Sequence, residues 1–244
     1  MTAVTTHSGQ TATFRRIAAL ALPALVVLAA EPLYLLVDTA VVGHLGRVPL
    51  AGLAIGGTLL AVTAWLGTVL AYGTTGRAAR SFGAGSRHLA VDEGVQASWL
   101  ALGAGLAMLP VLQLVAHPVT RALAGNTAVA AGAEQWLRIA SLGIPFILLV
   151  FAGNGWMRGV QDTRRPLYYV LGANLLSAVL CPLLVYPAGL GLSGSALANV
   201  SAQLLGGGLF LRALVREGGP LRPRWDLLRK QLVLGRDQIG RAHV

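Results

Sequence analysis

Six long runs of apolar residues, separated by short polar segments, make up most of this 244-residue chain. The first begins at Ile17 and is about 26 residues long, and a helix of that length spans about 39 Å at a rise of 1.5 Å per residue. That is enough to cross a hydrocarbon core of about 30 Å with some tilt. The pattern predicts an all-α membrane protein, a bundle of six transmembrane helices. The other five runs cover roughly residues 50–72, 89–116, 128–156, 167–186 and 192–214.

The composition supports the lipid bilayer as the surroundings of this chain. Hydrophobic residues make up 55% and charged residues 11%, whereas soluble domains have about 25% charged residues. The net charge of +10 does not indicate a nucleic-acid partner, because the arginines fall in short clusters between apolar runs and not in a patch interleaved with aromatic residues. The single cysteine, Cys181, excludes an intramolecular disulfide or a cysteine-built metal site. We expect no metal and no organic cofactor.

The sequence divides into four segments. Residues 1–13 are polar and are predicted to form a disordered cytoplasmic terminus, and residues 14–215 form the six-span bundle. Residues 216–237 are basic and contain proline, as expected of a cytoplasmic linker that leads into a seventh helix from Gln231. Residues 238–244 are predicted to be a non-native tail, since Ile-Gly-Arg-Ala-His-Val is the translation of a common sequencing-library adapter. Within the bundle we expect a turn at 47–49, a loop at 73–87, a kink at Pro110 and a turn at 117–126.

The distribution of basic residues predicts the orientation. Counting along alternating sides of the six spans, one side carries almost all Lys and Arg residues, and the other carries Arg47 and Arg121. Positively charged loops stay in the cytoplasm. We therefore expect the amino terminus and the segment after the sixth span to be cytoplasmic, in a multi-pass protein of the bacterial cytoplasmic membrane.

Two carboxylates lie inside the first span, where an unpaired charge costs at least about 2.5 kcal/mol. Glu31 and Asp38 are two helical turns apart and share one face of the helix with Tyr34. They should face protein or water, and they are candidates for a proton site. The alternative is a structural acid that pairs with a donor on a neighbouring helix.

Other polar residues of the spans fall into face-sharing sets. Glu134 and Arg138 are four residues apart in the favourable acid-then-base order, which predicts an ion pair. Asn174, Ser177 and Cys181 share one face of the fifth span, and Asn199 and Gln203 share one face of the sixth. Each alone is explained by packing between helices. Together with the acids of the first span they can line one water-filled cavity.

Two strings of this sequence resemble a known transporter family. They are EPLYLLVDTAVVGHLG at residues 31–46 and RGVQDTRRPL at residues 158–167. Both are similar to the multidrug and toxic compound extrusion (MATE) family, and most of all to its DinF-like branch. The resemblance runs from about Phe14 to Asp237, which corresponds to the amino-terminal half of a family member.

The resemblance implies roles for matching residues. Asp38 would be the ion-coupling acid, assisted by Glu31, and Pro23 would let the first helix bend. The family's usual aspartate on the fifth helix is replaced here by Cys181, and a thiol in an apolar site does not substitute for a carboxylate near neutral pH. Coupling would then rest on Asp38 with Glu31. The substrate cavity would be lined by Tyr34, Trp136, Asn154, Asn174, Ser177, Cys181, Asn199 and Gln203.

The function implied by the resemblance is secondary active export of small amphipathic or cationic compounds in exchange for H⁺ or Na⁺. In the family a second six-helix lobe follows the linker, so the chain as given is expected to be an inactive half that lacks its carboxy-terminal lobe. Two alternatives stay open: a flippase of lipid-linked precursors, which needs a more cationic cavity, and a non-transporting membrane scaffold. We expect no enzyme, because His44, His88 and His117 all lie at loop edges.

Overall fold

The computed structural model describes residues 32–218 and 221–224, and these residues form helices joined by short turns, with no strand among them. Five helical segments are long and apolar enough to cross a membrane, and a shorter apolar helix, Pro32–Gly43, precedes them. The all-α fold is confirmed, while Pro23 and Glu31 lie outside the described residues. The elements after Pro32–Gly43 are α2 (Arg47–Gly83), α3 (Arg87–Leu123), α4 (Thr127–Ala140), the 3-10 turn η1 (Ser141–Gly143), α5 (Ile144–Gly159), α6 (Arg164–Val185) and α7 (Leu192–Arg216).

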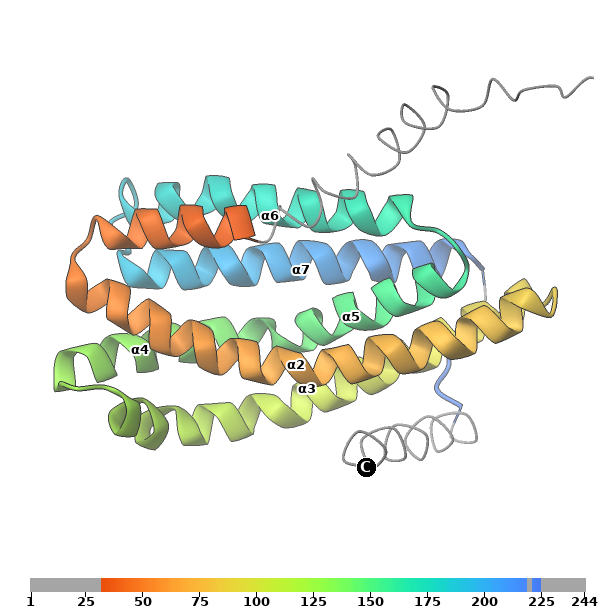
Figure 1. The fold of residues 1–244 in the computed structure, drawn as a ribbon, viewed down its shortest axis with the longest axis horizontal. Helices are drawn as coiled ribbons and strands as arrows, with labels where there is room; N and C mark the ends of the chain where they lie inside the picture. Colours follow the sequence, from red (N-terminus) through yellow and green to blue (C-terminus); the bar gives the residue numbers. More distant parts are fainter. Residues whose placement is uncertain (1–31, 219–220, 225–244) are drawn as a thin grey trace, which may run out of the picture.

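The helices run roughly along one common axis (Figure 1). The pair α6 and α7 lies side by side, with Pro32–Gly43 next to it, and α2 and α3 form the opposite side of the bundle. Between them α5 packs against α2, α3 and α7. One buried cluster surrounds Trp136 and Leu148, and a second surrounds Trp156 and Phe210. The bundle therefore has a core of its own along its length.

The turn before α2 lies slightly earlier than the sequence suggested. We predicted it at residues 47–49, but Arg47 already begins the helix and the chain reverses at Gly46, whose φ of 120° is readily adopted only by glycine. Pro49 then falls in the first turn of α2, where a backbone N–H has no partner within the helix. The proline is therefore compatible with the start of the helix.

The predicted loop at 73–87 is wrong over most of its length, because α2 continues through Gly83. Packing explains the difference: Thr74 and Ala78 are fully buried, and Arg77 Nε donates to Glu93 Oε2 of α3 at 2.8 Å. Tertiary contacts thus outweigh the glycine and serine content of this stretch. With 37 residues, α2 is about 55 Å long and exceeds the thickness of a hydrocarbon core.

One expectation for α3 is also corrected. The helix extends to Leu123 across most of the predicted turn at 117–126, and it continues through Pro110, where a kink was predicted. A proline removes a single backbone hydrogen bond, and the rest of the ladder persists on both sides of it. Conversely, the fourth apolar run is interrupted by η1 at residues 141–143, just before Pro145 at the start of α5. Its two parts still form one membrane-length segment, Thr127–Gly159.

Small residues such as Gly52 and Gly56 of α2 allow the helices to approach closely. A Cβ on Gly52 would lie 3.1 Å from the backbone nitrogen of Ala133 in α4, and one on Gly56 would lie 2.7 Å from the ring of Trp136. On α5, a Cβ on Gly155 would meet the carbonyl oxygen of Ala71 in α2. Lipid tails are as apolar as the helix surfaces, so the hydrophobic effect does not drive helices together inside a membrane. Close van der Waals contacts such as these hold the helices together instead.

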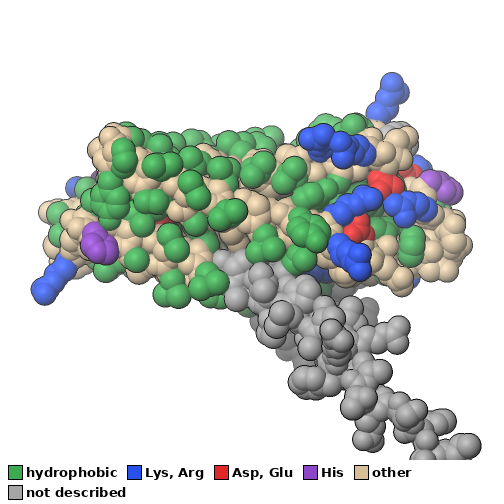
Figure 2. All heavy atoms as spheres, turned by 90° about the horizontal axis from the view of Figure 1, so that it is seen from above, with side chains coloured by type: hydrophobic (Ala, Val, Ile, Leu, Met, Phe, Trp, Pro, Cys, Tyr) green, Lys and Arg blue, Asp and Glu red, His purple; other side chains and the backbone are tan. Residues whose placement is uncertain are grey.

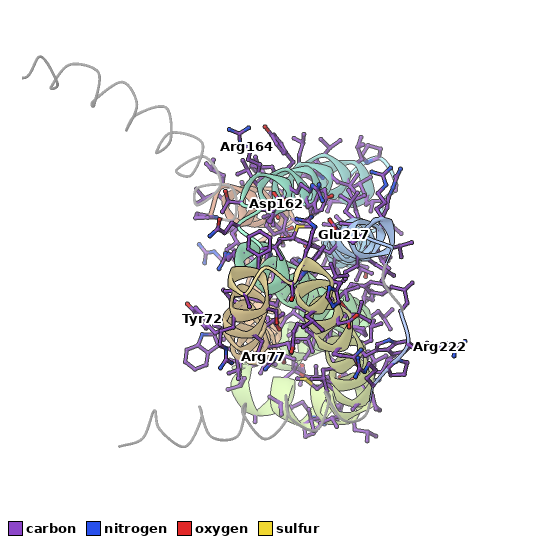
Figure 3. All side chains as sticks on the ribbon, turned by 90° about the vertical axis from the view of Figure 1, so that its right-hand side faces the viewer. Tyr72, Arg77, Asp162, Arg164, Glu217 and Arg222 are labelled. Atoms are coloured by element: carbon purple, nitrogen blue, oxygen red, sulfur yellow. The ribbon has the colours of Figure 1, made fainter. Side chains whose placement is uncertain are left out.

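Charged side chains gather at one end of the bundle, and hydrophobic side chains cover its middle (Figure 2). We call this the arginine end; it comprises the last turns of α2 and α7 and the first turns of α3 and α6. Glu217 bridges two of these elements, since it accepts from Arg87 Nη2 at 3.0 Å and from Arg165 Nη1 at 3.5 Å. Looking onto this end, Arg164, Asp162 and Glu217 lie on the α6–α7 side, and Tyr72 and Arg77 lie on the α2 side (Figure 3).

Candidate functional site

Asp38 is a buried acid at the place where three helices meet. It lies on Pro32–Gly43 with only 4% of its surface exposed. Ser195 Oγ of α7 donates to Asp38 Oδ1 at 2.7 Å, and Cys181 Sγ of α6 donates to the same oxygen at 3.1 Å. Hydrogen bonds to a carboxylate are stronger than those between neutral groups. The carboxylate therefore ties the first described helix to both α6 and α7.

A fourth helix joins this network through an indole. Trp136 of α4, which is 2% exposed, donates from Nε1 to Ser195 Oγ at 3.2 Å. Ser195 thus accepts from Trp136 while it donates to Asp38, so that its hydroxyl proton points at the carboxylate. Because each partner comes from a different helix, displacement of any one of these helices changes the hydrogen bonding of the acid.

The same faces carry a second polar layer one helical turn away. On each of the three helices that surround Asp38 a polar side chain lies four residues before or after its partner in the acid layer, and positions four apart share a face. In this second layer Asn199 Nδ2 donates to the hydroxyl of Tyr34 at 2.9 Å. The three pairs are Tyr34 and Asp38, Ser177 and Cys181, and Ser195 and Asn199.

Two polar atoms of the second layer have no hydrogen-bond partner among the described residues. They are Ser177 Oγ and Asn199 Oδ1, and both are buried. A buried polar group without a partner costs about 1–3 kcal/mol, so proteins keep such groups where they serve a purpose. Both atoms can accept a hydrogen bond or coordinate a cation. They make this part of the bundle a polar site and not simply a packed interface.

Some of the residues predicted from the sequence belong to the hydrogen-bond network of Asp38, and others do not. The structure brings together Asp38, Tyr34, Cys181, Asn199 and, through Ser195, Trp136. Asn154, Asn174 and Gln203 are half-buried, and no hydrogen bond joins them to this network among the described residues. Gln203 lies against Gly143, where a Cβ would be 3.4 Å from its Cβ. Glu31 and Pro23 lie outside the described residues.

Ser195 is the member of the site that the sequence analysis missed. It has the shortest hydrogen bond to Asp38, yet a lone serine in a stretch of small residues carries little signal. The spacing of Ser195 is a signal that could have been used. Ser195 lies four residues before Asn199, and it therefore continues the helix face of Asn199 and Gln203 by one turn. Extending every polar face in both directions would have found it.

The predicted ion pair between Glu134 and Arg138 is confirmed, with Arg138 Nη2 2.9 Å from Glu134 Oε1. Glu134 also pairs with His117 of α3, whose Nδ1 lies 2.7 Å from Oε2, a contact that joins α3 to α4. A surface cavity of about 320 Å³ lies at the arginine end between α6 and α7, far from Asp38. No group of three or more metal-ligating side chains gathers in the described ranges.

Membrane-length helices with a carboxylate buried among them form a multi-pass membrane protein, and such an acid marks a candidate ion or substrate pathway. A family model described as MatE matches residues 23–183. The chain therefore belongs to the MATE family of transporters, as its two signature strings indicated.

Relatives place the chain within this family. It is 36% identical over 236 residues to DNA damage-inducible protein F of Escherichia coli (strain K12), covering 91% of this chain and 50% of that protein. It is 34% identical over 205 residues to Protein DETOXIFICATION 44, chloroplastic, of Arabidopsis thaliana, covering 78% and 39%. The predicted DinF-like branch is thus confirmed. The chain spans half or less of the length of these two relatives.

Solved structures show the same fold. A MOP superfamily transporter from Pyrococcus furiosus Vc1 (DSM3638) superposes with a TM-score of 0.79 at 23% identity, over 90% of this chain and 50% of that chain. An inward-facing MATE family transporter gives a TM-score of 0.75 at 23% identity, over 87% and 52%. These likenesses establish the fold of this chain as that of about half of a MATE transporter.

Proposed function

We propose that this chain forms the amino-terminal lobe of a secondary active transporter, which exports small amphipathic or cationic compounds in exchange for an inward flow of cations. The observation that carries the proposal is Asp38, an acid 4% exposed and held by donors from two other helices. An ionisable group inside a membrane bundle is expensive and marks ion or substrate pathways. The family membership of the chain supports the same reading.

The hydrogen bonding of Asp38 favours H⁺ as the coupling ion. Ser195 and Cys181 both donate to Oδ1, and a metal cation on that oxygen would have to displace these donors. A proton can add to Oδ2 and leave both contacts in place. The position that carries an aspartate in many family members holds a thiol here, so a cation would also find one carboxylate where those members offer two. Na⁺ is the alternative, for which Ser177 and Asn199 would supply neutral oxygens.

Protonation of Asp38 gives a physical route to a change of conformation. A hydrogen bond to an ionised group contributes about 1.5–3 kcal/mol, against about 1 kcal/mol for a neutral pair. Neutralising the carboxylate therefore weakens its bonds to Ser195 and Cys181 together. The helix Pro32–Gly43 is then held less firmly against α6 and α7, and an equilibrium between two arrangements shifts. In this proposal the proton acts on the packing of one helix.

The remaining parts of the proposal concern the substrate and the rest of the transporter. The carboxylate would attract cationic substrates, and alternating access usually needs a second repeat, consistent with the half-length match to solved transporters. The flippase alternative is less well supported. The arginine within the fourth apolar run, Arg138, is 45% exposed and paired with Glu134, and the network around Asp38 contains no Lys or Arg side chain in the described ranges.

The proposal is tested in proteoliposomes that contain this lobe together with its second lobe. An imposed proton gradient should drive export of a fluorescent cation such as ethidium, and a sodium gradient of equal size should drive it less. Liposomes containing the 244-residue chain alone serve as the control and should show no export. An export rate that depends on neither gradient would argue against secondary active transport.

The orientation is a further part of the proposal, supported by the gathering of charge at the arginine end. Alkaline phosphatase, which is active only outside the cytoplasm, should stay inactive when fused after Arg216 in the bacterial membrane. The matched fusion after Gly125, in the turn between α3 and α4 at the opposite end, should be active. The reverse pattern would show the chain to be inverted, and activity at both sites would contradict the three spans that lie between Gly125 and Arg216.

A further inference from the structure

The segment 221–224, beyond the end of α7, lies along α3 and is held there by its main chain. Trp99 Nε1 donates to the carbonyl oxygen of Leu221 at 2.8 Å, and Gln96 Nε2 donates to that of Arg222 at 3.1 Å. The backbone N–H of Arg224 donates to Gln96 Oε1 at 2.7 Å. Arg222 is seen at the side of the arginine end opposite Tyr72 (Figure 3). More than 120 residues of sequence separate the two partners of each bond.

The side chains that hold the segment form one stripe on α3. Asp92, Gln96 and Trp99 follow one another at spacings of four and three residues, which places them on the same helix face. Gln96 is 1% exposed, and Asp92 is 9% exposed with Oδ2 3.7 Å from Arg224 Nη1. The three residues share one function in the structure, because each of them contacts the segment.

The side chain of Gln96 bonds the main chain of the segment and not its side chains. Its amide donates to the carbonyl oxygen of residue 222 and accepts from the N–H of residue 224, so both ends of the amide bond the main chain of the segment. Pro223 lies between these two residues, and its missing N–H is not needed by this pattern. The sequence of the segment is therefore suited to this contact.

We propose that the stripe Asp92–Gln96–Trp99 is a docking site for the chain that follows α7, and that it fixes the point at which the polypeptide leaves the bundle. The occupant is the segment 221–224 of the same chain. The docked segment supplies partners to both ends of the Gln96 amide, which is 1% exposed with the segment in place. Residues 221–224 then belong to the folded lobe and move with α3. This inference does not depend on the transported compound or on the coupling ion.

Limited trypsin digestion of the full chain in detergent tests the docking site. Trypsin cleaves after Arg224 but not after Arg222, because Pro223 follows, so the bond between residues 224 and 225 reports on the segment. Gln96→Leu removes both amide contacts at nearly constant size and should speed cleavage at Arg224 about fivefold or more, as expected when two hydrogen bonds that hold a segment are lost. Cleavage sites and rates are read by mass spectrometry.

Two further variants keep the test decisive. Gln113→Leu is the matched control: the same residue type on α3 makes two hydrogen bonds to Arg138 and Ser141, away from the segment, and its loss should leave cleavage at Arg224 unchanged. Trp99→Phe keeps an aromatic ring but loses the N–H donor, and should give a smaller acceleration. If Gln96→Leu does not fold, Trp99→Phe decides alone. Unchanged cleavage at Arg224 in the folded variants would overturn the docking site, and acceleration in all three would show general loosening of α3.

Discussion

Export driven by a cation gradient is expected to fall to the level of protein-free liposomes when Asp38→Asn is introduced into the two-lobed transporter. The amide keeps the size of the side chain and an oxygen that can accept from Ser195 and Cys181, but it cannot bind and release a proton. Folding and substrate binding should therefore persist while coupling is lost. Equilibrium binding of the dye, measured beside export on the same sample, separates the two effects.

Two variants of residues that contact Asp38 should change export less severely or in a different way. Ser195→Ala removes one of the two donors to the carboxylate and should reduce export less than Asp38→Asn does. Cys181→Asp places a second carboxyl within about hydrogen-bond distance of the first, and two such groups share a proton. It should change the pH dependence of export or its preference between H⁺ and Na⁺. Near-native export by Asp38→Asn under a proton gradient would remove this acid from the mechanism.

The second large effect is expected from Gly155→Leu, which should lower the melting temperature of the bundle. A Cβ at this position would meet the carbonyl oxygen of Ala71 and would lie 3.0 Å from its Cα, so the added side chain has to push α5 away from α2. Overpacking of a tight contact costs about 1–3 kcal/mol and occasionally more. For a protein of this size about 3 kcal/mol lowers the melting temperature by roughly 6–12 °C. Size-exclusion profiles after heating measure the shift.

Gly208→Leu is the control for this prediction. Gly208 lies on α7, is exposed, and a Cβ there has no neighbour within 4 Å among the described residues. Leucine has a much higher helix propensity than glycine at either site, so the difference between the variants reports the contact with α2 and not propensity. Equal melting temperatures for the two variants would mean that α2 and α5 do not touch at Gly155.

Periodicity and charge in the sequence were sufficient to predict the helical class and the acid on the first helix, while the family was predicted from the resemblance of two strings to known members. Long apolar runs allow few alternatives, because a chain in lipid must satisfy its backbone within each helix. What could not be predicted were features that depend on neighbours. The stretch at 73–83 forms a helix since Thr74 and Ala78 are buried against other elements, and Ser195 becomes part of the site because α7 brings it to Asp38.

The position of Cys181 has a practical consequence for experiments on this protein. It is the chain's one cysteine, it is 1% exposed, and its sulfur contacts the acid at 3.1 Å. Within these 244 residues a thiol-specific reagent has a single target, and it reaches that target only when the space around Asp38 opens to water. The rate of alkylation would time this opening in the unmodified sequence, with no engineered label. In this lobe, the reactivity of Cys181 therefore reports directly on the access of water to Asp38.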